Sequence, residues 1–573
     1  MTIKYFMEKI FSRKSTPFII IAVLGFMLYF QALFFGFSYL DDNTLILDNK
    51  YFLNDLANIP AAFQGDVFHL FNHSAAYFRP LLTISLMLDY QLGGATPFMY
   101  HFTNIILHII AACLVFVFLK KLDYGKYLAF LFSIIFLVHP VLTQAVAWIP
   151  GRNDSLLAIF VLAAFIFFLD YLKSAEKKYL IRCLIFFLLA LFTKESALLI
   201  LPVSIFYFYF SGNTENKISS KKLSVFAGSS AAIIALWFLL RHNAVGNGIQ
   251  MSFYDMLKSV YLNFPATIQF VGKIFFPFNL TVLPIIQDTT FIYGIITIIL
   301  LAIIIFFTKT KRYGMFFFGA AWFFAFLLPS FIRPNTALTA DFIEHRLYVP
   351  IIGFFIILLE TDVIKKINFK KTAHLIIVGS IIFILCAVTL FHSRNFSSRL
   401  AFWKNAVEHS SHYPLAHRNL GAMLFLDGKL DEAEPEFKKA LELNPTEEMA
   451  HNNLGLIYAN ENKLSEAEDE YKKELEINPY YDNGFFNMGL LYYKEGRQDE
   501  AESAWKRTLE LNPNYSDALY ALASLYYNQK KYSDASVYAG EINRRGLPLQ
   551  GELRQLIGQS AASSQLLNVN GLK

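Results

Sequence analysis

The feature that most constrains the fold of this 573-residue chain is a series of apolar runs, each long enough to cross a membrane. About 20 apolar residues in a helix span the roughly 30 Å hydrocarbon core of a bilayer. The chain is 17% charged, whereas a soluble globular domain is about 25% charged. About eleven spans are expected, at residues 17–38, 101–119, 127–147, 155–172, 179–193, 196–210, 223–240, 291–308, 313–332, 347–360 and 373–391.

Lysines and arginines are concentrated in alternate loops between these runs. They lie at residues 4–14, 120–126, 173–182, 217–222, 309–312 and 365–371. Cytoplasmic loops of membrane proteins carry such an excess of basic residues, so the N-terminus is expected in the cytoplasm. The intervening loops and everything after about residue 392 are then expected on the outer side. Within residues 251–277, Pro265 breaks an apolar stretch, which predicts an interfacial or re-entrant helix pair.

The C-terminal part of the chain has an internal period of 34 residues. Small residues recur at positions 421, 455, 489 and 523, aromatic ones at 437, 471 and 505, and prolines at 445, 479 and 513. This pattern resembles tetratricopeptide repeats, in which small residues let two helices approach and proline ends the second. The fourth repeat has Ala539 at the large position, as a capping repeat can have. Such arrays mostly bind peptides or partner proteins.

The predicted fold class is therefore all-α, with a polytopic bundle of transmembrane helices followed by an α-solenoid. The expected domains are a transmembrane domain at 1–392, a connector helix at 393–413, about four repeats at 414–549 and a weakly ordered tail at 550–573. Cys113, Cys183 and Cys386 each lie inside an apolar run, so neither a disulfide framework nor a metal site is expected from them.

Ionisable side chains gather near the span ends on the expected outer side. Every outer loop brings an acid, a base or both to about the same depth, so one patch could combine a general base with cations for a phosphate. Each residue also has an ordinary explanation, such as a helix cap, a solvated loop or a local ion pair. The group comprises Asp41, Asp42, Asp48, Arg79, His101, His108, His139, Arg152, Asp154, Lys194, Glu195, Arg241, Lys273, Arg333, Glu344, His345 and Arg346.

Several segments, taken in order, resemble the family of transmembrane and tetratricopeptide-repeat-containing O-mannosyltransferase-like proteins. More broadly they are similar to GT-C membrane glycosyltransferases. The segments are YLDDNTLILDN at 39–49, RPLLTIS at 79–85, HPVLTQAVAWIPGRND at 139–154, KESALLILP at 194–202 and EHRLYVPIIGFF at 344–355. The resemblance implies a GT-C-type helix bundle and an outer active site with an acid in the first outer loop. It also implies a polyprenyl-phosphate-linked sugar donor.

The resemblance assigns roles to individual residues. Asp41 or Asp42 would be the catalytic base, with Asp41 favoured. The implied donor-phosphate ligands are Arg79, Arg346, Lys194 and Arg152. The residues implied to orient the acceptor or assist catalysis are Glu195, Asp154, Glu344 and His139. No particular cofactor is predicted from these residues, although a divalent cation could bind such an acidic site.

The expected function is transfer of a hexose, such as mannose, from the lipid donor to a protein hydroxyl or envelope glycan, with inversion at the anomeric carbon. The repeats would recruit the acceptor, and no nucleic-acid partner is expected. Two alternatives remain: a periplasmic polysaccharide polymerase or ligase that depends on Arg and His in an outer loop, and a non-catalytic repeat scaffold. A bacterial inner membrane with periplasmic repeats is favoured over an endoplasmic reticulum membrane with lumenal repeats.

Overall fold

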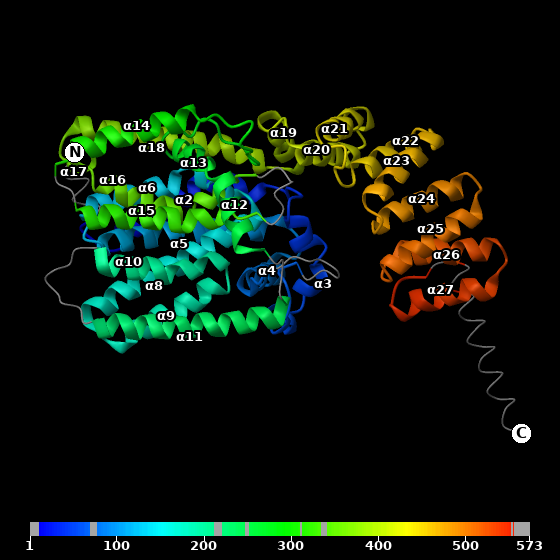
Figure 1. Cartoon of the computed structure of the whole chain (residues 1–573), viewed down its shortest axis with the longest axis horizontal. Coiled ribbons are helices and arrows are strands. Elements are labelled where there is room, and N and C mark those ends of the chain that lie inside the picture. Colours follow the sequence, from blue (N-terminus) through cyan, green and yellow to red (C-terminus); the bar gives the residue numbers. More distant parts are fainter. Residues whose placement is uncertain are drawn as a thin grey trace, which may run out of the picture. The chain divides into compact units, whose positions relative to one another are not determined.

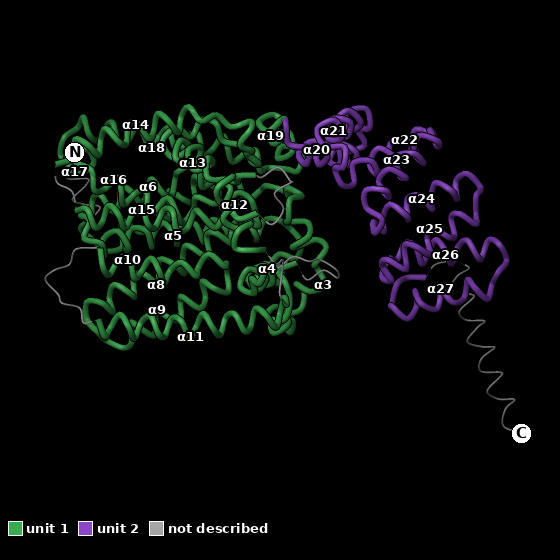
Figure 2. Tube along the Cα trace, in the orientation of Figure 1, with its two compact units in different colours: residues 1–411 green, residues 412–573 purple. Residues whose placement is uncertain are grey.

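The computed structural model describes residues 11–68, 77–210, 220–246, 251–309, 312–333 and 341–549, together with 551 and 554. Within these ranges the chain is helical and has no strand, apart from an isolated antiparallel bridge between Ile285 and Asp341. The chain divides into two compact units, residues 1–411 and 412–573 (Figure 2). These observations confirm the predicted all-α class.

Each predicted apolar run contains a helix of unit 1 (Figure 1). Among the described residues, six helical stretches are long and apolar enough to span a membrane: Thr16–Phe34 (α2 and η1), Pro97–Lys121 (α5), Ile149–Ser174 (η6 and α8), Ser220–Val245 (α11), Tyr313–Phe331 (α15 and η8) and Thr372–Phe396 (α18 and η10). A seventh, Lys126–Val138 (α6) with Pro140–Ala147 (η5 and α7), bends by 54°. The others are shorter: Lys177–Leu191 (α9), Glu195–Phe210 (η7 and α10), Ile292–Phe307 (α14) and Pro350–Leu359 (α16). The number of eleven spans therefore stays a prediction.

The core of unit 1 forms around α5, which packs against α2, α6 and α8. Helices α15 and α16 approach closely because glycines meet: a Cβ on Gly319 would lie 2.7 Å from the carbonyl oxygen of Gly353. Trp322 on α15 is fully buried and donates from Nε1 to the carbonyl oxygen of Val349, 2.9 Å away. This contact joins α15 to the residue that precedes α16, at the end of the bundle where the outer loops are expected.

Three of the basic loops meet at one end of unit 1. Glu360 is buried there and accepts hydrogen bonds from Tyr124 (2.7 Å), Arg312 (2.6 Å) and Lys365 (2.8 Å), which come from three different basic loops. The short helix α17 (Asp362–Lys365) marks this end in Figure 1. Shared placement of these loops supports the prediction that they lie on the same side of the membrane.

The remaining short elements of unit 1 include α3, α4 and α12, which lie toward the end away from α17 in Figure 1. These short elements are η2 (Asn43–Leu47), α3 (Lys50–Leu53), η3 (Leu56–Asn58), η4 (Ala61–Phe63), α4 (Pro80–Gly93), α12 (Phe253–Asn263), α13 (Ala266–Phe275), η9 (Glu344–Leu347) and α19 (Arg399–His409). Helices α12 and α13 form the expected pair, broken at Pro265. Its interfacial position stays a prediction.

The second unit consists of helical hairpins. They are α20 (Pro414–Leu426) with α21 (Leu430–Leu443), α22 (Ala450–Asn460) with α23 (Leu464–Ile477), α24 (Asp482–Lys494) with α25 (Gln498–Leu511), and α26 (Ser516–Asn528) with α27 (Tyr532–Arg544). A Cβ on Gly455 would lie 2.6 Å from the Tyr471 ring, so only glycine fits opposite the aromatic residue. In the last hairpin Ala523 occupies the glycine position and Ala539 occupies the aromatic position, and both are fully buried. Without the aromatic ring, the facing position no longer needs to be glycine.

The segment predicted as a connector contains η10 (Arg394–Phe396) and α19, and unit 1 continues to Ser411. Its helix α19 begins after Ser398, whose hydroxyl accepts a hydrogen bond from the Ala401 amide. The predicted tail at 550–573 lies outside the described residues, except for Gly551 and Arg554.

Candidate active site

A cavity of about 590 Å³ opens at the end of unit 1 that lies away from the basic loops. Its walls come from the first outer loop, the starts of α4 and α8, the 193–196 loop, the ends of α11 and α15, and residues 343–350. The ionisable side chains of Asp, Glu, Lys, Arg and His that line it are Asp41, Arg79, Asp154, Lys194, Glu195, Arg241, Arg333, His345 and Arg346. Segments far apart in the sequence therefore bring acids and bases to one cavity.

The two adjacent aspartates occupy different positions in a tight turn. Tyr39 and Asp41 have positive φ angles of 60° and 65°, a left-handed conformation that aspartate tolerates better than most residues. The buried carboxylate of Asp42 accepts hydrogen bonds from the amide of Ser38 (2.6 Å), the Ser38 hydroxyl (2.9 Å) and the Tyr39 amide (2.7 Å). Asp42 therefore closes the turn, while Asp41 lines the cavity.

The carboxylate of Asp41 has no hydrogen bond or ion pair to any residue that the structure describes. The side chain is exposed to the cavity, which is deep enough for desolvation to raise its pKa to about 6. The negative charge of Asp341 adds to this rise, and Arg79 opposes it. A carboxylate with a pKa close to the working pH, and with no other partner, has the properties of a general base.

Two cations lie across the cavity in pairs with carboxylates. Arg79, at the start of α4, donates to Glu195 at 3.1 Å. Lys194 donates to Asp154 at 2.8 Å. Lys194 and Glu195 are thus not a local ion pair, because each contacts a residue from another helix. These contacts join α4, α8 and the 193–196 loop around the cavity.

Asp341 holds two further cations of the cavity. Its carboxylate accepts hydrogen bonds from Arg346 (2.7 Å) and Arg333 (3.0 Å). Although burial opposes this, the two guanidinium groups hold the pKa of Asp341 below its ordinary value. Guanidinium groups fixed by a carboxylate are well suited to hold a phosphate, because their remaining N–H groups are already oriented.

His345 and Trp148 form a second wall beside Asp154. The rings of His345 and Trp148 lie 5.4 Å apart, and His345 Nε2 is 3.7 Å from a carboxylate oxygen of Asp154. Burial lowers the pKa of His345 to about 3, so the imidazole is neutral. Trp148 donates from Nε1 to the carbonyl oxygen of Leu40 at 3.0 Å, which anchors the turn of Asp41.

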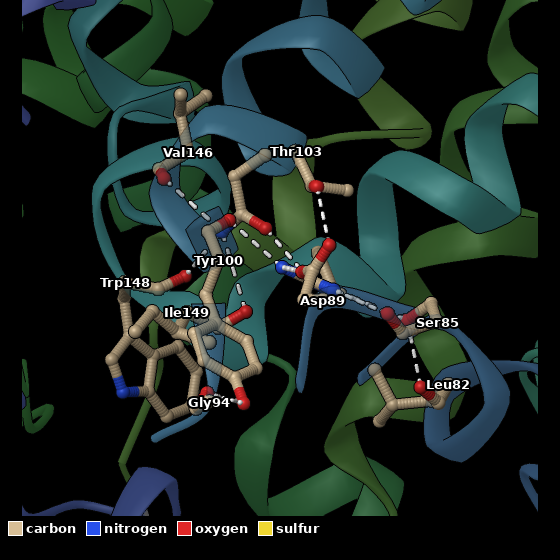
Figure 3. A network of polar contacts seen from close by, with 11 residues as sticks. Leu82, Ser85, Asp89, Gly94, Tyr100, Thr103, Val146, Trp148 and Ile149 are labelled. Carbon is tan, nitrogen blue, oxygen red and sulfur yellow. Dashed lines mark hydrogen bonds and ion pairs between the residues drawn. The ribbon is translucent and has the colours of Figure 1, made fainter. Parts of the chain in front are cut away.

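Arg152 lies outside the cavity lining and belongs to a buried network, whose members Asp89, Tyr100 and Thr103 are labelled in Figure 3. Its guanidinium group is 2.6 Å from the carboxylate of Asp89 and donates to Asn104 (2.9 Å) and to the carbonyl oxygen of Tyr100 (2.8 Å). Asp89 in turn accepts from Thr103 at 2.6 Å. The network joins α4, α5 and α8. All three guanidinium nitrogens of Arg152 bind protein, with Nε donating to Asn104, Nη1 to Ser85 and Nη2 to Tyr100.

Glu344 and His139 are also buried outside the cavity lining. Glu344 accepts a hydrogen bond from Lys273 at 2.7 Å and lies 3.4 Å from His392. It does not pair with Arg346, its sequence neighbour, because Arg346 contacts Asp341. His139 shares a hydrogen bond of 2.9 Å with the carbonyl oxygen of Ile274.

The structure thus brings six of the ten residues with implied roles to the cavity: Asp41, Arg79, Lys194, Arg346, Glu195 and Asp154. It also brings Trp148 to the cavity and places Asp341 behind the lining, although the sequence-based prediction includes neither residue. Both occur in outer loops beside residues that were singled out, which is the signal that could have found them. In the described ranges no three His, Cys, Asp or Glu side chains form a metal-binding group, and the divalent cation stays a prediction.

Comparison with known proteins supports the repeats and the resemblance. Tetratricopeptide-repeat family models match residues 414–447, 436–469 and 486–542. The chain is 32% identical over 187 residues to Protein O-mannosyl-transferase Tmtc1 of Drosophila melanogaster, covering 31% of this chain and 21% of that protein. It is 36% identical over 151 residues to Protein O-mannosyl-transferase TMTC3 of Homo sapiens, covering 26% of this chain and 16% of that protein.

A longer match is to Protein O-mannosyl-transferase F38B6.6 of Caenorhabditis elegans, with 26% identity over 393 residues, 65% of this chain and 54% of that protein. The chain thus aligns with about half or less of each of these relatives. Among solved structures, the crystal structure of MamA matches 29% of this chain and 90% of its own, at 17% identity and a TM-score of 0.23. The chain thus contains tetratricopeptide repeats and is similar to proteins that are named protein O-mannosyl-transferases.

Proposed function

We propose that this chain is a membrane glycosyltransferase that moves a hexose, such as mannose, from a polyprenyl-phosphate donor to a hydroxyl group of a protein or envelope glycan. One observation carries the proposal: Asp41, a carboxylate without a partner among the described residues, lines the same cavity as Arg79, Lys194 and Arg346. The relatives named protein O-mannosyl-transferases support the reaction class.

In the proposed reaction, Asp41 takes the proton of the acceptor hydroxyl as its oxygen attacks the anomeric carbon. The bond between that carbon and the phosphate oxygen breaks, and the polyprenyl phosphate leaves with the electron pair. A single displacement of this kind inverts the anomeric carbon. A positioned general base contributes roughly 10²- to 10⁴-fold to such a rate.

The cations of the cavity stabilise the leaving phosphate. Negative charge on the phosphate grows as the bond breaks, so guanidinium and ammonium groups placed beforehand favour the transition state over the ground state. Arg79, Lys194 and Arg346 have this role, while Glu195 and Asp154 hold the first two of these cations in position. Arg152, Glu344, His139 and Asp42 support the cavity from behind through buried contacts.

The cavity opens, in this proposal, on the outer side of a bacterial inner membrane, where the energy for transfer comes from the lipid phosphate bond. The repeats recruit the acceptor on that side. The basic loops at the opposite end of unit 1 support this orientation, because such loops face the cytoplasm.

The test is sugar transfer from a panel of synthetic polyprenyl-phosphate sugars to proteins and glycans extracted from envelopes. Wild type is compared with Asp41→Asn and with a control, Asp48→Asn, whose exposed side chain lies outside the cavity lining. We expect Asp41→Asn to lose at least about a hundredfold in rate, and Asp48→Asn to keep wild-type activity.

Two outcomes would count against the proposal. Wild type that transfers none of the sugars would remove the transferase function and favour the repeat scaffold. Full activity of Asp41→Asn would remove the role of the early acid and favour a polymerase or ligase that depends on outer-loop Arg and His residues.

A further inference from the structure

The helix before the repeats contacts the turn that carries Asp41. Trp403 on α19 is fully buried, and its Nε1 donates to the carbonyl oxygen of Ser38 at 3.0 Å. Ser38 is the residue whose amide and hydroxyl hold the Asp42 carboxylate. Just before the turn, the amide of Gly36 donates to the carbonyl oxygen of Ser397 at 2.9 Å. Residues 397–403 therefore fix the turn from outside the cavity.

The same helix also contacts the segment that leads to the cationic side of the cavity. The amide of Val282 donates to Asn405 Oδ1 at 3.0 Å, and the hydroxyl of Ser410 donates to the carbonyl oxygen of Leu283 at 2.7 Å. Trp403 and Asn405 point about 200° apart around the helix axis, because each residue of an α-helix turns by about 100°. Helix α19 thus lies between the turn that carries Asp41 and the segment at residues 282–283.

The segment held by Asn405 is joined to Asp341. The amide of Phe342 donates to the carbonyl oxygen of Pro284 at 2.7 Å, and Ile285 forms the isolated bridge with Asp341. Asp341 then binds Arg346 through its carboxylate. The contacts therefore run from α19 through residues 282–285 to a guanidinium group of the cavity.

We infer that α19 is a positioning element of the active site, with Trp403 setting the place of Asp41 and Asn405 setting the place of Arg346. The inference rests on the proposed function. Because the carboxylate of Asp41 makes no hydrogen bond or ion pair to a described residue, the backbone of its turn determines where that carboxylate lies. A displacement of about 1 Å at a reacting group can cost on the order of a hundredfold in rate.

Steady-state kinetics can distinguish the roles of Trp403 and Asn405. Trp403→Phe keeps an aromatic ring, although a smaller one, and removes the indole N–H group. We therefore expect kcat to fall by about tenfold, with an unchanged KM for the polyprenyl-phosphate sugar. The acid limb of its pH–rate profile should also move, because the surroundings of Asp41 change. Asn405→Leu removes the acceptor for Val282, so we expect the donor KM to rise by about tenfold, with a smaller change in kcat.

Two control variants are compared with Trp403→Phe and Asn405→Leu, and the thermal unfolding of all four variants is measured. Lys404→Ala alters an exposed side chain on the same helix and should leave kcat, KM and the pH profile unchanged. Val161→Ala truncates a fully buried side chain in the middle of α8 and should lower the unfolding temperature without altering kcat or KM.

Wild-type kinetics for Trp403→Phe and Asn405→Leu, in an active wild-type background, would overturn this inference and leave the proposed function intact. Equal effects on kcat and KM, matched by Val161→Ala at the same loss of stability, would also overturn it. A wild type that transfers no sugar would instead overturn the proposed function itself.

Discussion

Asp41 and Asp42 are neighbours in the chain, yet their carboxylates have different surroundings. Asp42 is 1% exposed, and its carboxylate closes the turn by accepting three hydrogen bonds. Asp41 is exposed to the cavity and carries a left-handed backbone that directs its side chain away from that turn. The preference for Asp41 as the base therefore has a structural reason, although its catalytic role remains a proposal.

The pH dependence of activity follows from the surroundings of Asp41. Burial in the cavity raises its pKa to about 6, so the unprotonated base predominates only above that pH. We expect kcat/KM to rise as pH increases through about 6 and then to level off. Steady-state rates between about pH 5 and pH 8 measure this. A profile that is flat down to about pH 4, the ordinary pKa of aspartate, would contradict the assignment.

The same raised pKa predicts a stability effect. The folded protein binds the proton of Asp41 more tightly than the unfolded chain, so stability declines as pH rises through the folded pKa of about 6. Removing the charge by Asp41→Asn should therefore stabilise the protein at about pH 7.5. The gain should be about 1 kcal/mol, because solvent in the cavity screens the group.

Thermal unfolding in detergent at about pH 7.5 and at about pH 4 checks this sign, since the gain should vanish at the lower pH. Asp48→Asn serves as the control. A loss of stability in Asp41→Asn at the higher pH would show that the carboxylate has a stabilising partner.

At the scale of elements, Arg152 shows how a buried cation can join helices. It is fully buried at the start of α8 and pairs with Asp89 of α4 at 2.6 Å. Arg152→Leu should lose roughly 3–5 kcal/mol of stability, because Asp89 would remain charged and unpaired. Arg152→Leu combined with Asp89→Leu should lose less than the single change. Denaturant unfolding of the two variants measures the difference.

A normal stability for Arg152→Leu together with weakened donor binding would contradict the structural role. In that case Arg152 would be a phosphate ligand, as the resemblance implies. Arg346→Leu is the matched variant within the cavity, and it should weaken donor binding.

The helices could be predicted from the sequence because apolar runs and a fixed period determine them locally. The directions of side chains at the helix ends could not. Three of the predicted site residues bind buried protein groups and do not line the cavity. Arg152 pairs with Asp89, Glu344 pairs with Lys273, and His139 shares a hydrogen bond with the carbonyl oxygen of Ile274. Those partners are distant in the sequence, so no local pattern distinguishes a residue that faces the cavity from one behind it.

At the scale of the molecule, unit 1 has two chemically distinct ends. Basic loops gather around Glu360 at one end, and the cavity opens at the other. The sequence predicted this separation because the loops alternate. It could not predict that α19 fixes the turn of Asp41, because the residues joined, Ser38 and Trp403, are 365 positions apart.

This arrangement predicts which residues a membrane-impermeant reagent can reach from each side of the membrane. In a protein whose three cysteines are replaced by alanine, Asp48→Cys should react with a membrane-impermeant maleimide in intact spheroplasts. Lys366→Cys, exposed at the basic end, should react only after the membrane is opened. The reverse pattern would contradict the proposed orientation.

In the proposed reaction Asp41 acts in the chemical step, and the cations of the cavity hold the sugar donor. The direct measurement is the single-turnover rate of sugar transfer by Asp41→Asn saturated with polyprenyl-phosphate sugar, with donor binding measured on the same sample. We expect a rate at least about a hundredfold below wild type, with an unchanged Kd for the polyprenyl-phosphate sugar. A wild-type single-turnover rate, or a loss explained entirely by weaker donor binding, would contradict it.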